Sequence, residues 1–130
     1  MPNYKKDTES KLVKGLLDFI VLQLLSGQPM HGYQIISSIR KGFGVYFGPS
    51  TIYPLLATME KKGVITSEWN IKTQRPRKIY NITKEGQNQL TFTENSLLAI
   101  CKRMAPTGVS AEAADYSGVT FKSATALKEA

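Results

Sequence analysis

Two groups of positively charged side chains give this sequence its clearest chemistry. Lys61 and Lys62 close one amphipathic segment, and a second group occupies seven residues without an acidic side chain: Lys72, Arg75, Arg77 and Lys78. Lysine and arginine bind phosphate groups through charge and hydrogen bonds. Cations this close repel one another, so their clustering favours a polyanionic partner over a solvated hairpin tip, which remains the alternative. Both groups are therefore candidate DNA contacts.

The segment that leads to Lys61 has the spacing of a helix with one buried face. Its apolar residues recur at i, i+3, i+4 and i+7, which places them on one side: Ile52, Leu55, Leu56 and Met59. Pro54 lacks a backbone N–H and is expected in the first turn, so Ser50 or Thr51 is predicted to cap the helix. Gly63 is expected to end it.

The opposite face of this helix is predicted to carry small, hydroxyl-bearing and basic side chains. Such a face fits a DNA groove, although an ordinary solvated face has the same composition. An alanine or threonine methyl group can pack on a thymine methyl group, so the expected base contacts are Ala57, Thr58 and Lys61. Hydroxyl groups that can bind phosphates, and so set register without reading sequence, belong to Tyr33, Ser50, Thr51 and Tyr53.

Enzyme chemistry has little support in the sequence. The chain has one histidine, His31, and one cysteine, Cys101, so it lacks the pairs and clusters that form disulfides or ordinary metal sites. It has no glycine-rich phosphate loop, and no pair of nucleophile and base stands out by its spacing. We expect no catalysis, no metal and no cofactor. His31 is expected to cap the helix that follows it rather than to contact phosphate or sense pH.

Composition places the chain among basic proteins of one domain. It has 130 residues, with 17 Lys and Arg against 10 Asp and Glu and a formal net charge of +7. The positive excess lies in residues 1–104 and favours nucleic acid or an anionic surface as partner. The N-terminus is polar, and no run of about 18 apolar residues occurs, so no membrane contact is expected. We expect a cytoplasmic protein.

The order of the predicted elements is that of a winged helix. Residues 11–25 are apolar nearly all round a helical projection, and a second helix is expected from about residue 31 to residue 43. The period then changes to 2 in two runs, 65–71 and 77–83, which predict a hairpin with a basic tip. Trp69, in the first run, is expected to be part of the core or to cover it. The fold class is α+β, mainly α: a flexible arm in residues 1–10, then a winged helix-turn-helix in residues 11–83.

Residues 84–104 are predicted to form a last helix, capped by Thr83, that joins two copies of the chain. A narrow apolar stripe runs along it at intervals typical of a coiled coil: Leu90, Leu97, Cys101 and Met104. With Leu12 and Leu16 of the first helix, this stripe is the predicted dimer interface. Packing on the same domain would need the same spacing and stays open. Residues 105–130 show no period and are treated as a tail of uncertain structure.

Three segments, taken in order, resemble the PadR family of transcriptional regulators: GLLDFIVLQLLSGQPMHGYQII, GPSTIYPLLATMEKKGVI and RPRKIYNITKEGQNQL. The resemblance extends from Lys14 to about Leu90. It implies a winged helix-turn-helix, a homodimer held by the C-terminal helix with help from the first helix, and repression from a palindromic operator. It also implies contacts with the DNA backbone from the wing, Arg75 to Lys78, and from Tyr33, Ser50, Thr51 and Tyr53.

The chain departs from the family pattern at two places. Many relatives have Pro-Gly-Thr where residues 49–51 are Pro-Ser-Thr, and a glycine where Gln74 stands. The short stretch after the wing resembles the short subfamily, whose effectors are planar phenolics or hydrophobic cations bound near the dimer interface. The resemblance is compatible with release by a small aromatic or hydrophobic effector, but the existence of an effector stays open and we assign no residue to it. The alternative of a different class is a protein-interaction module whose basic wing docks an acidic partner.

Overall fold

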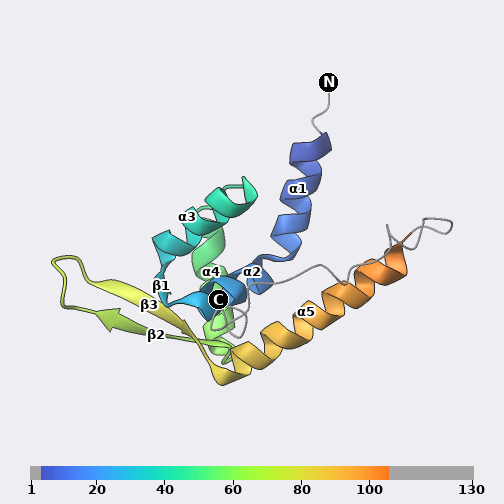
Figure 1. Cartoon of the computed structure of the whole chain (residues 1–130). Coiled ribbons are helices and arrows are strands. Elements are labelled where there is room, and N and C mark those ends of the chain that lie inside the picture. The colour runs from blue at the N-terminus through green and yellow to red at the C-terminus, as the bar shows by residue number, and fades with distance from the viewer. Residues whose placement is uncertain (1–3, 106–130) are drawn as a thin grey trace.

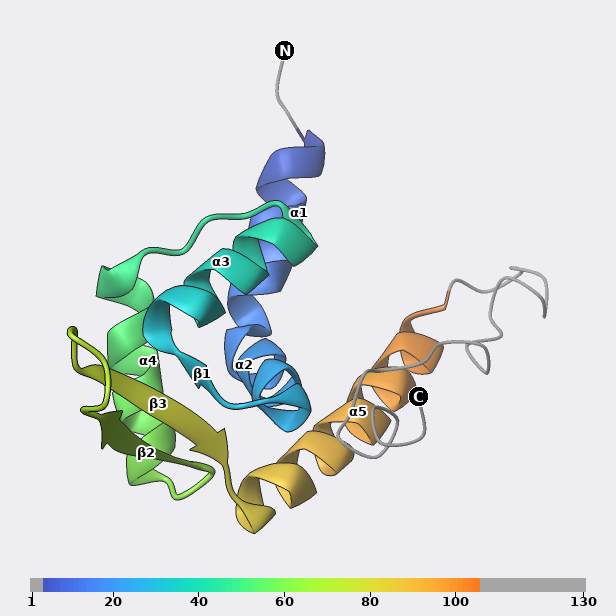
Figure 2. The same ribbon diagram turned by 60° about the vertical axis from the view of Figure 1, so that its left-hand side comes forward.

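Eight elements make up residues 4–105, the part of the chain that the computed structural model describes (Figure 1). In chain order they are α1 (Tyr4–Gly15), α2 (Leu17–Gly27), β1 (Met30–His31), α3 (Gly32–Phe43), α4 (Pro49–Lys61), β2 (Ile65–Asn70), β3 (Arg77–Ile82) and α5 (Lys84–Met104). Helices α2, α3 and α4 form a body with the sheet, and α1 and α5 project from it (Figure 1, Figure 2). The β2–β3 hairpin extends from the body as a wing. The predicted winged helix-turn-helix with a C-terminal helix is confirmed.

The core lies between the three body helices and the sheet. Helix α2 contributes most to it, because its side chains are buried nearly all round: Leu17, Phe19, Ile20, Val21, Leu22 and Leu25. Helix α4 adds three of the four side chains predicted for its inner face: Ile52, Leu56 and Met59. Each such side chain contributes about 2 kcal/mol when it leaves water, which explains why α4 is held firmly by its inner face. Among residues 4–105, no helix is both long enough and apolar enough to span a membrane.

The N-terminal stretch is helical where an irregular arm was expected. The arm was predicted over residues 1–10, but α1 begins at Tyr4, so that prediction is wrong for the residues described. Asp7 lies in the first turn of α1 and Lys14 in its last turn. Charges of these signs at these ends stabilise the helix dipole, which supports a helix in this polar stretch.

The first predicted helix is also divided in two. Residues 11–25 were expected to be continuous, but Leu16, directly after Gly15, has φ −110° and ψ 12° and separates α1 from α2. The Leu16 N–H donates to the Val13 carbonyl at 3.0 Å, which closes the end of α1. The break lets α1 leave the body in its own direction (Figure 2).

Helix α4 begins earlier than the sequence predicted. Its N-cap is Gly48 and Pro49 lies in its first turn, so the prediction that Ser50 or Thr51 caps it is wrong. Pro49 suits this place because the missing N–H would have had no partner there. Pro54 lies inside the helix, where it cannot donate to the carbonyl of Ser50. Ser50 is exposed, so the missing bond lies at the surface of the protein and not in its core.

A strand of two residues, β1, completes a sheet with the order β1-β3-β2. The sequence did not predict it, because two residues show no period. Met30 and His31 of β1 pair with Tyr80 and Ile79 of β3. This pairing places the start of α3 beside the base of the wing.

Trp69 does not contribute to the core. Ile65 at the start of β2 is 1% exposed, whereas Trp69 near its end is 63% exposed. The two residues share a face of the strand, but the wing extends beyond the body, so only the start of β2 is covered. The expectation that Trp69 belongs to the core or covers it is wrong.

Thr83 caps α5, as predicted, and ties it to the turn after α4. Its Oγ1 accepts the Gly86 N–H at 3.0 Å and donates to the Gly63 carbonyl at 2.7 Å. The Thr83 N–H donates to the Val64 carbonyl at 3.1 Å. Gly86 lies so close to this carbonyl that a β-carbon would collide with it. These contacts fix the direction in which α5 leaves the body.

Candidate nucleic-acid interface

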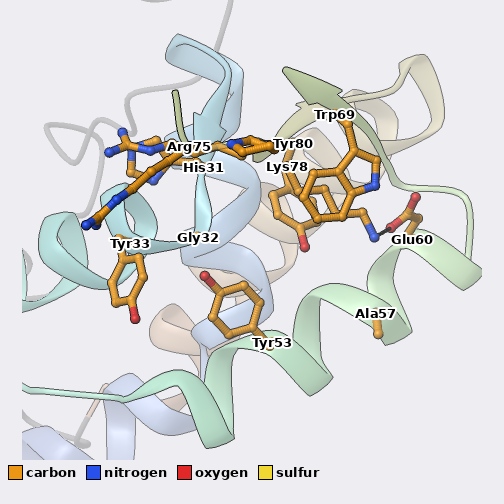
Figure 3. Close-up of a pocket in the computed structure, with 12 residues that line it drawn as sticks. His31, Gly32, Tyr33, Tyr53, Ala57, Glu60, Trp69, Arg75, Lys78 and Tyr80 are labelled. Atoms are coloured by element: carbon orange, nitrogen blue, oxygen red, sulfur yellow. Dashed lines mark hydrogen bonds and ion pairs between the residues drawn. The ribbon is translucent and has the colours of Figure 1, made fainter. Parts of the chain in front are cut away.

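The wing and helix α4 face each other across a cavity of about 610 Å³ (Figure 3). Its walls are the start of α3, one side of α4 and the β2–β3 hairpin. Most side chains that carry chemistry here are aromatic or cationic: Tyr33, Tyr53, Trp69, Arg75, Arg77 and Lys78. The structure therefore brings wing cations and predicted phosphate-binding tyrosines to one surface.

Helix α4 presents two flanks with different neighbours. Tyr53 and Ala57 line the cavity beside the wing, whereas Thr58 and Lys62 line a second cavity, of about 520 Å³, against α2 and α5. Successive residues of a helix are rotated by about 100°, which accounts for this separation. The Thr58 hydroxyl also donates to the Pro54 carbonyl at 3.0 Å. Of the two methyl groups expected to touch bases, only that of Ala57 lies beside the wing.

The other predicted contacts lie outside the cavity. Ser50 and Lys61 are exposed on α4, and Thr51 is half-buried in its first turn. Lys72 is exposed in the connection between β2 and β3. None of these side chains lines the cavity.

Lys78 is held by the body of the protein. Its Nζ lies 3.8 Å from Oε1 of Glu60 and 5.9 Å from the centre of the Tyr80 ring. The other oxygen of Glu60 accepts a hydrogen bond from the Ser67 hydroxyl at 2.6 Å. An exposed ion pair contributes at most about 1 kcal/mol, but Glu60 competes with phosphate for the Lys78 ammonium. Lys78 is thus less available to DNA than the sequence implied.

His31 caps α3, as predicted, and also reaches the wing. Its Nδ1 lies 3.4 Å from the Gln34 N, whose N–H it accepts when the ring proton is on Nε2, and the Gln34 side chain accepts the His31 N–H at 2.9 Å. Its Nε2 lies 3.0 Å from Nη1 of Arg77, a contact that sequence analysis missed. Burial, followed by the positive charge of Arg77, lowers the pKa of His31 below its ordinary value. The imidazole is therefore neutral at neutral pH.

Tyr53 and Tyr80, which line the cavity, keep their protons. Burial is the main reason that the pKa of Tyr53 is raised, and the electrostatic interaction with Tyr33 raises it further. Burial is the main reason that the pKa of Tyr80 is raised, and electrostatic interactions with Glu60 and, less strongly, with Tyr53 raise it further. Neutral phenols present O–H donors and no negative charge to a phosphate. Tyr33 and Tyr53 are 66% and 37% exposed, so both are accessible to a ligand, whereas Tyr80 is buried.

Gly32 makes room for the Tyr53 ring. A β-carbon on Gly32 would collide with the ring and the hydroxyl of Tyr53, as their approach in Figure 3 indicates. Helical periodicity does not reveal this requirement, because the two residues belong to different helices.

Gly32→Ala is expected to weaken DNA binding several-fold with little change in the stability of the fold. The partly exposed Tyr53 ring can swing outward to relieve the collision, which costs about 1 kcal/mol, and alanine recovers about as much in helix propensity. Urea denaturation and a DNA titration measure the two effects. Gly42→Ala in the same helix is the matched control, because its β-carbon meets nothing within 4 Å. Equal DNA affinity of the two variants would show that the position of Tyr53 does not matter.

Helices α1 and α5 project from the body away from the wing (Figure 1). Each carries exposed apolar side chains: Leu12 on α1, and Phe92, Ile100 and Met104 on α5. Leu90 is 1% exposed and packs in the core of its own protomer, so its assignment to a dimer interface is wrong. Leu16 and Leu97 also pack against that core and are partly buried, and Cys101 is half-buried. Of the predicted interface, Leu12 and Met104 are exposed, as is Ile100 on α5, whereas Phe92 lines the second cavity beside α4.

Known proteins share this sequence pattern and architecture. Residues 21–92, more than half of the chain, match the transcriptional regulator PadR-like family. The structure is similar to that of a PadR family transcriptional regulator from Eggerthella lenta, with 31% identity, a TM-score of 0.68, and 77% of this chain and 90% of that chain covered.

Two further relatives agree with this match. A PadR-like transcriptional regulator from Bacillus cereus has 28% identity and a TM-score of 0.64, with 70% of this chain and 89% of that chain covered. A Mycobacterium tuberculosis protein named as a transcriptional regulator is 27% identical over 85 residues, which are 65% of this chain and 78% of the relative. The chain belongs to the PadR-like family and is a DNA-binding transcriptional regulator.

Proposed function

We propose that the protein is a homodimeric repressor that binds a palindromic operator with α4 and the wing of each protomer. The observation that carries this proposal is the cavity where Tyr33, Tyr53 and Ala57 lie beside Arg75 and Arg77 of the wing. Aromatic hydroxyls, guanidinium groups and a small helical side chain are suited to a DNA backbone next to an open groove.

Each part of this surface has a distinct task in the proposal. The outer side of α4 enters the major groove, where small Ala57 permits a close approach to base edges. The wing lies against the backbone or the minor groove, where arginines bind phosphates or reach the narrow groove. Tyr33 and Tyr53 donate to phosphates and set the register. Lys61 and Lys72 add charge at the margins of the surface.

Dimerisation uses the apolar surface on α1 and α5. Leu12, Ile100 and Met104 are exposed in one protomer, and burying such side chains contributes about 2 kcal/mol each. A twofold axis through this surface would present two wings and two copies of α4 to successive turns of one duplex. The operator is then palindromic because it mirrors the symmetry of the dimer.

The family resemblance implies repression. A dimer bound to promoter DNA represses by occluding the polymerase. The described residues do not single out a place for the small effector that the same resemblance implies, so we propose repression without assigning an effector.

A titration of the dimer with promoter DNA at two salt concentrations tests the function. Four exposed cations, Lys61, Lys72, Arg75 and Arg77, give eight phosphate contacts in a dimer. Contacts of this number predict a loss of affinity of about a thousandfold or more between about 50 and 200 mM salt, because condensed counterions are released on binding. Fluorescence anisotropy with labelled DNA measures the dependence. Affinity for the promoter that equals the affinity for unrelated DNA at both concentrations would contradict the proposal.

A further inference from the structure

His31 connects the start of α3 to the wing through contacts on both of its ring nitrogens. Nδ1 faces the backbone N–H of Gln34 at 3.4 Å, and Nε2 faces Nη1 of Arg77 at 3.0 Å. The β1–β3 pairing, in which His31 lies opposite Ile79, brings the ring within reach of the wing. The contact with Arg77 joins residues 46 positions apart and spans the edge of the cavity.

The hydrogen-bond donors around the ring decide its form. A backbone N–H and a guanidinium can only donate, whereas a neutral imidazole has one accepting nitrogen. The shorter, charge-assisted contact with Arg77 is the stronger one, so we assign the acceptor role to Nε2 and the proton to Nδ1. In this tautomer the longer bond from the Gln34 N–H to Nδ1 is not made. The capping bond from the His31 N–H to Gln34 Oε1, at 2.9 Å, persists in this form. A protonated ring would have no acceptor for Arg77 and would repel it.

The cations of the wing differ in how far other side chains restrict them, and His31 restricts Arg77. Lys78 is already paired with Glu60 on α4. Arg75 is exposed in the connection between the strands. An arginine that is ordered before DNA arrives loses less side-chain entropy on binding, and the guanidinium retains N–H groups for a phosphate after one donates to His31.

The geometry points to His31 as a positioning residue for DNA binding: its neutral imidazole holds the Arg77 guanidinium at the edge of the cavity between the wing and α4. This role rests on the proposed function, because it assigns the ordered arginine to the operator backbone. The other charged or titratable side chains that line the cavity are Tyr33, Tyr53, Glu60, Arg75, Lys78 and Tyr80.

Two substitutions separate this role from helix capping. The side-chain oxygen in His31→Asn occupies the place of Nδ1, so it can cap α3 but is too short to reach Arg77. The longer side chain in His31→Gln can present an oxygen to Arg77 near the place of Nε2. We expect His31→Asn to weaken operator binding by about fivefold or more, because two arginines per dimer are no longer ordered, and His31→Gln to stay near the wild type. Thermal unfolding should be nearly unchanged in His31→Asn.

A double-mutant cycle with Arg77→Ala supplies the decisive comparison. If His31 acts through Arg77, adding His31→Asn to Arg77→Ala causes no further loss of affinity. A full additional loss, wild-type affinity of His31→Asn, or wild-type affinity of Arg77→Ala would each overturn the assignment.

Nuclear magnetic resonance of the free protein reads the contact without DNA. His31 is the one histidine of the chain, so its ring signals need no separation from others. We expect the tautomer with a proton on Nδ1, and a rise in the pKa of His31 in Arg77→Ala, because the neighbouring positive charge is gone. An unchanged pKa would overturn the contact itself.

If the contact is present but wild-type protein binds no operator, the proposed function fails and this role fails with it. If the operator binds and only the His31→Asn prediction fails, the proposed function stands.

Discussion

Replacing Arg75 and Arg77 together with alanine is expected to weaken operator binding by close to a thousandfold. A dimer presents two copies of each arginine, which makes four contacts, and about 1 kcal/mol for each gives about 4 kcal/mol. The slope of affinity against salt should also become shallower, by about 0.9 for each phosphate that the protein no longer neutralises. Anisotropy titrations of both proteins over a range of salt concentrations measure the affinity and the slope together.

The matched control for this variant removes two charges far from the wing. Lys102→Ala with Arg103→Ala changes the net charge equally, but both residues lie in the last turn of α5 (Figure 1). If binding depended only on net charge, the two double variants would lose the same affinity. That result would remove the wing from the interface, and it would favour a general attraction between a basic protein and DNA.

Ile100→Glu combined with Met104→Glu is expected to convert the dimer to monomers. The two residues lie one helical turn apart on α5, are 43% and 73% exposed in the protomer, and occur twice in a symmetric interface. Losing the burial of four such side chains costs about 6 kcal/mol or more, a change of at least about ten thousandfold in the dimer dissociation constant. Sedimentation velocity measures the mass, and operator binding should fall as the second half-site is lost.

Lys102→Glu tests whether any acidic residue on α5 has this effect. Its side chain is exposed and lies on another side of the helix from Ile100. Leu97 is a poorer position for such a test, because it packs against the core of its own protomer. A dimer that persists with glutamate at both Ile100 and Met104 would exclude this face of α5 from the interface.

The sequence was sufficient to predict the helices and strands that are long enough to show several repeats of their period. Ile52, Leu56 and Met59 repeat with the helical period and are buried, and the change of period after Gly63 marks the hairpin. Thr83 and His31 were identified as caps because each precedes a run of helical periodicity. These features depend on residues that are close together in the sequence, so the sequence alone was enough to predict them.

Other features depended on contacts between distant residues. Leu90 has the spacing of a dimer seam, but the same spacing also packs a helix on its own core, and tertiary structure decides between them. Trp69 is exposed because β2 extends past the body. The alternation of apolar and polar residues along β2 cannot show where the body ends. The contact between His31 and Arg77 requires the register of β1 on β3, and β1 is too short to have a period.

The start of α4 was missed for a different reason. Pro49 and Pro54 both occur in the segment, and the sequence analysis placed the later one in the first turn. The cost of a proline inside a helix is the carbonyl bond that it removes and the contact of its ring with the preceding turn. Ser50, whose carbonyl loses this bond, is an exposed residue, and exposure is a property of the folded protein.

The most direct measurement is a footprint of the purified protein on the DNA that flanks its own gene. We expect two protected half-sites related by a twofold axis and centred about 10 base pairs, or a multiple of this spacing, apart. Both should disappear in the variant that lacks Arg75 and Arg77. A single protected half-site, or protection no stronger than on unrelated DNA, would contradict a dimer that reads DNA with α4 and the wing.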